Sequence, residues 1–116
     1  MRYMLLIYTN ESTDPAPGQA GFDEMMAGYG AFTQEVQSNG AFLSGDPLAS
    51  IATATTVRVR AGKTLMSDGP FAETKEQLGG YYILECKNID EAVAYAAKIP
   101  GANHGSVEVR PILAMG

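Results

Sequence analysis

The sequence predicts an α+β protein with a ferredoxin-like sandwich, in which two helices cover one face of an antiparallel sheet. The first observation behind this prediction is the order of patterned segments: strand, helix, strand, an extra hairpin, strand, helix and strand. The second is composition. The 116 residues are 46% hydrophobic and contain no repeat or linker-like tract, so a single domain over residues 1–116 is expected.

Each expected element rests on a local pattern. In chain order, the elements are a strand over residues 2–9, a loop over 10–21, a helix from Phe22 to a stop at Asn39-Gly40, a strand over 41–48 broken at Gly45-Asp46-Pro47, a hairpin of 55–60 and 63–67 that turns at Ala61-Gly62, a strand over 80–86, a helix from residue 89 to a stop at Pro100-Gly101, and a strand over 106–112. The first helix is predicted by apolar residues at helical spacing, among them Tyr29, Phe32 and Val36.

The hairpin and the second helix have the clearest signals. Val57 and Val59 alternate with arginines, so we expect the valines to face protein and the arginines to face solvent or a ligand. Asn88 and Glu91 have the spacing of a capping box, with Asn88 as the N-cap of the second helix. An apolar face that includes Ile99 continues that helix to its proline stop.

Two predicted strands are apolar on both sides, although two helices can cover only one face of the sheet. These strands are residues 3–8 and 81–84. Either the loop over 10–21 folds across the second face, or a second copy of the chain covers it. The loop is polar and broken by prolines, so the sequence favours a homodimer with the uncovered sheet faces packed together.

Composition narrows the function classes. The net charge of -5 argues against a nucleic-acid partner, which would need a basic patch. The N-terminal apolar run is too short for a signal-peptide core or a membrane span, and a lone Cys86 fits a reducing compartment, so a cytoplasmic location is expected. One His and one Cys give no zinc pattern, and the glycines form no phosphate-binding loop, so we expect neither a metal nor a cofactor.

The segment over residues 67–81, Ser-Asp-Gly-Pro-Phe-Ala-Glu-Thr-Lys-Glu-Gln-Leu-Gly-Gly-Tyr, resembles the signature of DGPF-type proteins of the YCII-related superfamily. The N-terminal strand, residues 52–58 and residues 105–111 resemble the same proteins, so the likeness extends over the whole chain. It implies a ferredoxin-like fold that pairs sheet to sheet as a dimeric α/β barrel. It also implies genes that often adjoin those of extracytoplasmic-function sigma factors.

The resemblance further implies a candidate site, because some members place a His and an Asp in a shared cleft. Asp68, at the end of a strand and before a stiffening Gly-Pro, is the candidate catalytic carboxylate. An ordinary turn aspartate is the alternative. The superfamily's His lies in the first helix, where this chain has Tyr29 and Phe32 instead. The single histidine, His104, lies in the loop before the last strand and is the only candidate partner base.

Five further residues are candidate ligand-binding groups. They are Asp46 in the second rigid turn, Arg58 on the hairpin, Phe71 and Lys75 in the signature segment, and Tyr81 at its end. Each also has a plainer interpretation as a turn, solvated or packing residue. Asp46 and Asp68 would form an acid–base pair only if the fold brought them together.

Three functions remain open from the sequence. The first is a small cofactor-independent enzyme, similar to a lyase or isomerase, that uses Asp68 in a cleft. The second is a non-catalytic ligand-binding or regulatory module linked to sigma factors. The third is a dimerisation protein without a small-molecule site. A polar group held in an apolar cleft would favour the first two.

Overall fold

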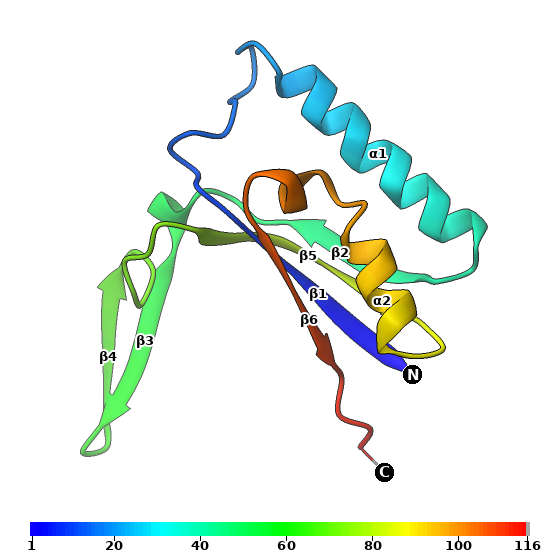
Figure 1. Ribbon diagram of the computed structural model, residues 1–116. Coiled ribbons are helices and arrows are strands. Elements are labelled where there is room, and N and C mark those ends of the chain that lie inside the picture. The colour runs from blue at the N-terminus through cyan, green and yellow to red at the C-terminus, as the bar shows by residue number, and fades with distance from the viewer. Residues whose placement is uncertain (116) are drawn as a thin grey trace.

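A four-stranded antiparallel sheet in the order β2-β5-β1-β6 forms the body of the protein (Figure 1). The structure is a computed structural model that describes residues 1–115. Its elements are β1 (Arg2–Thr9), α1 (Phe22–Ser38), β2 (Phe42–Pro47), β3 (Thr55–Arg60), β4 (Lys63–Asp68), β5 (Gln77–Glu85), α2 (Ile89–Ala96) and β6 (Ser106–Pro111), with short 3-10 turns at Ile51–Thr53 and Pro100–Asn103. This strand order and the two crossover helices confirm the ferredoxin-like prediction.

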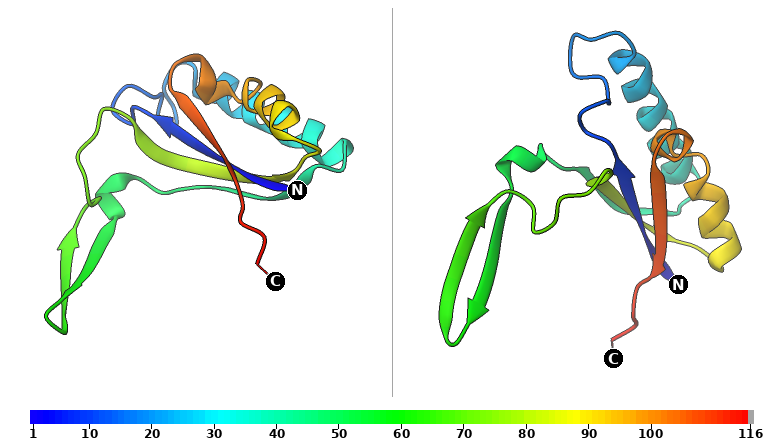
Figure 2. Two further views of the ribbon diagram at one scale, coloured as in Figure 1. Left: turned by 60° about the horizontal axis from the view of Figure 1, so that its bottom comes forward. Right: turned by 60° about the vertical axis from the view of Figure 1, so that its left-hand side comes forward.

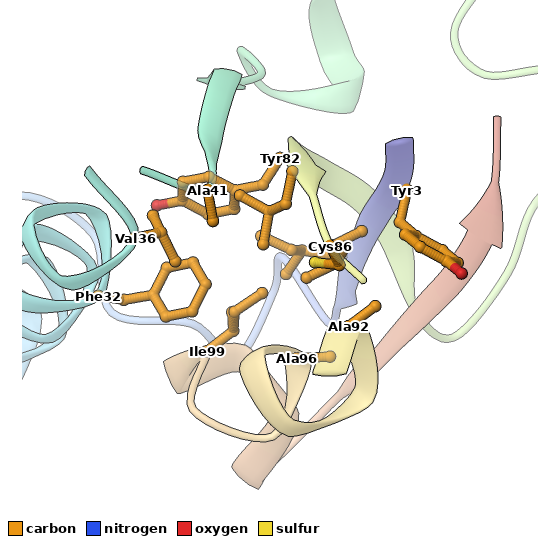
Figure 3. Packing of buried hydrophobic residues seen from close by; sticks show 12 residues of the cluster. Tyr3, Phe32, Val36, Ala41, Tyr82, Cys86, Ala92, Ala96 and Ile99 are labelled. Atoms are coloured by element: carbon orange, nitrogen blue, oxygen red, sulfur yellow. The ribbon is translucent and has the colours of Figure 1, made fainter. Parts of the chain in front are cut away.

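Both helices lie on one face of the sheet, and the opposite face carries no helix (Figure 2). Inward-facing residues of β1 and β5, such as Leu5 and Leu84, are fully buried against this helical layer. Phe32 and Val36 from α1 and Ile99 complete the contact (Figure 3). Burying side chains of this size contributes about 1.5–3 kcal/mol each, so this layer is the stable part of the fold.

The second helix begins as predicted and ends earlier. The Asn88 side chain accepts a hydrogen bond of 3.0 Å from the amide of Glu91, and the Glu91 carboxylate accepts one from the amide of Lys87 rather than from that of Asn88. The helix stops at Ala96, four residues before Pro100. Ile99 has an extended backbone (φ -71°, ψ 129°), because a residue that precedes proline disfavours the helical region.

Two strand boundaries also differ from the prediction. β5 begins at Gln77 instead of residue 80, because Gln77 pairs with Thr9 after an irregularity in the β1 pairing. Asp46 and Pro47 do not break the second strand but belong to it, opposite Tyr81 and Gly80. Proline is tolerated there because β2 is an edge strand of the sheet.

The hairpin of β3 and β4 pairs as predicted, around a turn in which Ala61 (φ 50°) and Gly62 (φ 76°) are both left-handed. It projects beyond the end of the sheet, on the side away from the helices (Figure 2). The radius of gyration is accordingly 16.1 Å, whereas a compact domain of this length has about 13 Å. The expectation that Val57 and Val59 face protein is wrong for the single chain, since they are 58% and 60% exposed.

The loop over residues 10–21 does not cover the second face of the sheet. Its Asp14 lies instead beside α1. The second face therefore presents half-buried apolar side chains, among them Met4, Leu6 and Ile83, without a covering element in residues 1–115. No helix of that part of the chain is long and apolar enough to cross a bilayer.

Candidate functional site

A cleft of about 810 Å³ lies between α1 and the neighbouring ends of β1, β2 and β5. One wall is formed by Met25, Met26 and Tyr29 of α1, and the opposite wall by Phe42 and Tyr82 of the sheet. Pockets that hold small molecules typically measure about 300–1,000 Å³ and are mostly apolar with a few polar groups. This cleft has that size and that kind of wall.

Tyr82 fixes the distance between the two walls. Its ring packs edge-on against Phe32, with centroids 4.9 Å apart, and its hydroxyl shares a hydrogen bond of 2.8 Å with the hydroxyl of Thr33 on α1. A Cβ atom at Gly45 would lie 2.7 Å from the Tyr82 ring, so only glycine allows the ring to lie over β2. The cleft is therefore preformed by packing.

Asp14 reaches the cleft through a tight turn after β1. The carbonyl of Asn10 accepts hydrogen bonds from the amides of Thr13 (3.1 Å) and Asp14 (3.0 Å). The Asn10 side chain accepts another from the amide of Ser12. This turn folds the chain back, so that Thr9 donates a hydrogen bond of 2.6 Å from its hydroxyl to Oδ2 of Asp14.

His104 contacts the same carboxylate from outside the cleft. Its Nε2 is 3.3 Å from Oδ1 of Asp14, and the two side chains are 47% and 23% exposed. The turn before β6 places the imidazole there: the carbonyl of Gly101 accepts a hydrogen bond of 2.8 Å from the amide of Gly105. A Cβ atom at Gly105 would lie 2.2 Å from the carbonyl oxygen of Tyr8, so this close approach requires glycine.

Tyr29 supplies a phenol to the same cleft. Burial raises the pKa of this phenol, a backbone hydrogen bond from Gly101 opposes the shift, and the negative charge of Asp14 adds to it. The hydroxyl therefore stays protonated at neutral pH and can donate a hydrogen bond. The carboxylate of Asp14 and the protonated phenol of Tyr29 thus line the same apolar cleft, and the His104 imidazole contacts the carboxylate from outside it. These are side chains that general acid–base catalysis uses.

Two further carboxylates lie along the edge of the cleft. Glu11 accepts a hydrogen bond of 3.3 Å from the amide of Ile51, and its own amide donates to the Gln77 side chain at 3.0 Å. Asp46 accepts a hydrogen bond of 2.8 Å from the Tyr81 hydroxyl. Both carboxylates are exposed, so they contribute charge to the mouth of the cleft rather than to its interior.

The structure separates the residues that the sequence proposed together. Asp68 is exposed at the end of β4 and does not line the cleft, so the expected position at the base of a cleft is wrong for the single chain. Phe71 is 79% exposed and is not a cleft wall. Asp46 and Asp68 lie on different sheets, and the acid–base pair considered for them is not formed.

The other candidates fall into two groups. Arg58 on the hairpin and Lys75 in the signature segment are exposed and lie outside the cleft. Tyr81 touches the site only through its bond to Asp46. His104 does not line the cleft, but it contacts Asp14, which does; its partner is therefore Asp14 rather than Asp68.

Sequence reasoning missed Asp14 and Thr9, because both lie where the pattern turns from strand to irregular loop. The signal for Asp14 was local: Asn10 is a strong turn former, and a turn there brings residue 14 back to the end of the strand. Tyr29 and Phe32 were expected on the inward face of the first helix, which contains no histidine. The Tyr29 side chain lines the same cleft as Asp14.

The family model of the YCII-related domain matches residues 1–116. This chain belongs to the YCII-related family. This YCII-related chain is 38% identical over 114 residues to an uncharacterised protein of Rhizobium meliloti (strain 1021), and the match covers 97% of this chain and 92% of the relative. It is also similar in structure to the 5-chloro-2-hydroxyhydroquinone dehydrochlorinase TftG of Burkholderia phenoliruptrix AC1100, solved in complex with 2,5-dihydroxybenzoquinone. That match has a TM-score of 0.49 and 15% identity, and it covers 97% of this chain and 94% of the other.

In this YCII-related chain the signature segment joins the hairpin to β5. Gly69 has a left-handed backbone (φ 91°), which glycine adopts at no steric cost. Its amide donates a hydrogen bond of 2.7 Å to the carbonyl of Ala54, and its carbonyl accepts one of 2.8 Å from the Thr56 hydroxyl. The Asp-Gly-Pro sequence therefore acts as the turn that ends the hairpin.

Proposed function

We propose that this YCII-related protein is a small enzyme that transfers a proton within a small molecule bound in the cleft between α1 and the sheet. The observation that carries the proposal is the Asp14 carboxylate, held by Thr9 and His104 at a cleft that the Tyr29 side chain also lines. Asp14 and Tyr29 line one apolar cavity of substrate size, and His104 contacts Asp14.

The chemistry assigns one role to each group. The Asp14 carboxylate accepts a proton from the substrate, and Thr9 and His104 hold the two carboxylate oxygens in place. The protonated Tyr29 hydroxyl donates a hydrogen bond to the substrate oxygen on which negative charge develops. In an isomerisation, Asp14 then returns the proton to another substrate atom. In an elimination, the electrons of the broken bond to hydrogen form a double bond, the leaving group departs with the electrons of its own bond, and Asp14 releases its proton to water.

A thermal-shift screen of small metabolites on the wild type and on Asp14→Asn tests this proposal, since a ligand stabilises the state that it binds. Asp14→Asn keeps the shape and removes the charge. Asp90→Asn is the control, because Asp90 lies exposed in the first turn of α2, away from the cleft. Hits that shift the wild type and Asp90→Asn are then incubated with each protein, and proton exchange or product is followed by NMR.

Turnover that is lost in Asp14→Asn and kept in Asp90→Asn supports the enzyme. Binding without turnover in any protein would contradict it and leave the non-catalytic ligand-binding module as the function. Hits that shift all three proteins equally would place the ligand outside the cleft and contradict the proposed site as well.

We further propose that the protein works as a homodimer whose two copies pack their uncovered sheet faces together. Two observations support this. The second face of the sheet is apolar along β1 and β5, and the projecting hairpin presents Val57, Val59 and Met66 on one side, at 58%, 60% and 73% exposure. A hairpin of two strands is marginal in water by itself, so contact with a second copy would stabilise it.

Light scattering at micromolar concentration tests the dimer. A mass of about twice 12.3 kDa is expected for the wild type, since interfaces of standard size hold at such concentrations. Met66→Lys introduces a charge on the apolar side of the hairpin and should shift the mass toward the monomer. Ser67→Lys places the same charge on the neighbouring position, whose side chain points to the other side, and should keep the dimer. A monomeric wild type would contradict the proposal.

A further inference from the structure

The charges around the cleft are all of one sign. Glu11, Asp14 and Asp46 line it. The chain has eight lysines and arginines, but within residues 1–115 none of them lines the cleft. Arg58, Arg60 and Lys63 are on the projecting hairpin, and the remaining cations lie elsewhere on the body. Among the residues that the structure describes, the cleft therefore has no lysine or arginine that could form an ion pair with a carboxylate or phosphate of a ligand.

Asp14 is the least exposed of these carboxylates, with 23% of its side chain accessible. Thr9 occupies one of its oxygens with a hydrogen bond of 2.6 Å, and His104 approaches the other from behind, since the imidazole itself does not line the cleft. An anionic ligand bound there would be repelled by a carboxylate in a partly dehydrated site, while a cation would be attracted.

The walls of the cleft fit the same kind of ligand. Tyr29, Phe42 and Tyr82 present three aromatic side chains, and aromatic faces attract cations in addition to packing against apolar groups. Met25 and Met26 add flexible side chains that adapt to the shape of a bound group. A ring-sized apolar body with a protonated amine would place the ring between these walls and the amine toward Asp14.

Deepening the proposed function, on which this inference rests, we infer that the cleft selects small amines with an apolar ring and rejects the corresponding carboxylates. Selectivity for charge follows from the residues that line the cleft and does not depend on whether turnover occurs. Asp14 is thereby both the proposed base and the group that determines the charge of the ligand.

Three probes with almost the same body separate the effect of charge from that of shape: benzylamine, benzyl alcohol and benzoate. Binding is measured by NMR titration of the wild type, Asp14→Asn and Asp90→Asn, with resonances of α1 and β5 reporting on the cleft. We expect benzylamine to bind the wild type more tightly than benzyl alcohol, and benzoate most weakly. A hydrogen bond to a charged group corresponds to a factor of roughly 10 to 100 in affinity, so Asp14→Asn should weaken benzylamine by about that factor.

Asp90→Asn should leave the order of the three probes unchanged, and Asp14→Asn should make benzylamine and benzyl alcohol nearly equal. Benzoate binding as tightly as benzylamine would overturn the inference about charge, while its contact with the cleft would still support the proposed site. If none of the three probes shifts the cleft resonances, both the inference and the proposed function of the cleft are overturned.

Discussion

His104 Nε2 lies 3.3 Å from Oδ1 of Asp14, and this contact joins the loop after β1 to the loop before β6. Because both side chains are partly exposed, the pair contributes less than about 1 kcal/mol to stability. The contact instead orients the carboxylate. Thr9 binds Oδ2 of Asp14 while His104 contacts Oδ1, so the carboxylate is held in one orientation.

The first prediction follows from this contact. His104→Ala should change the melting temperature little, but it should lower turnover or ligand binding in the cleft, because Asp14 loses one of its two contacts. His104→Gln keeps an N–H donor and should therefore retain part of the turnover or ligand binding that His104→Ala loses. A merely structural role of His104 would not require this difference between the two variants. Calorimetry and ligand titration on the three proteins check this. The prediction would be contradicted if both variants lost stability together with binding, and to the same extent.

The second prediction concerns stability at alkaline pH. The pKa of Tyr29 is raised in the folded state, chiefly by burial, so the folded state holds this proton more tightly than the unfolded state. Its contribution to stability is complete below the ordinary value of 10.0 and is lost as the pH rises through the higher folded pKa. Tyr29→Phe should therefore flatten the loss of stability above about pH 10. Urea unfolding at several alkaline pH values measures it.

The control for this experiment is Tyr95→Phe, which removes a hydroxyl on α2, outside the cleft and on the opposite side of the sheet from the proposed dimer contact. It reports how much of the alkaline change any tyrosine substitution produces. An alkaline slope in Tyr29→Phe as steep as that of the wild type would show that burial of this phenol does not contribute to the pH dependence.

The third prediction compares two glycines. A Cβ atom at Gly45 would lie 2.7 Å from the Tyr82 ring and 3.1 Å from the backbone oxygen of Tyr81, whereas a Cβ at Gly30 meets nothing within 4 Å. Gly45→Ala should destabilise the fold by about 1–3 kcal/mol, because the ring must move. Gly30→Ala should stabilise it by up to about 1 kcal/mol, because alanine favours the helix. Urea denaturation of both variants checks the difference, and a tolerated Gly45→Ala would contradict the packing described for Tyr82.

The fourth prediction separates the site in the structure from the one that the sequence proposed. Asp14→Asn should lower binding of any ligand that the screen identifies, while Asp68→Asn should leave binding in the single chain nearly unchanged, because Asp68 lies outside the cleft. Titration of one ligand against both variants is sufficient. Loss of binding in Asp68→Asn alone would return the function to the signature segment and contradict the site at Asp14.

Much of the fold could be predicted because it follows from local patterns. The capping residue Asn88, the alternating valines of β3 and the apolar faces of β1 and α1 each act over a few residues, and together they give the order of elements. Boundaries that depend on pairing could not be predicted in this way. β5 begins early because Gln77 and Leu78 find partners on β1, which only the assembled sheet provides.

The candidate site could be predicted only in part. His104 was named because it is the single histidine, but its distance from Asp14 depends on how two loops far apart in the sequence pack. The direction of Val57 and Val59 was wrong for the single chain, because alternation shows that two faces differ and does not show what covers either of them. Asp68 was given weight by its strand-end position, yet its Asp-Gly-Pro context serves a turn.

The hairpin can open separately from the main sheet. β3 and β4 pair with each other in a separate two-stranded sheet, so their amides can exchange with solvent when the hairpin opens, without unfolding of the main sheet. Contact with a second copy would slow that exchange, while exchange in β1 and β5 would still follow global unfolding. Hydrogen exchange in the hairpin would thus report on the proposed dimer, and exchange in the central strands reports the stability of the fold.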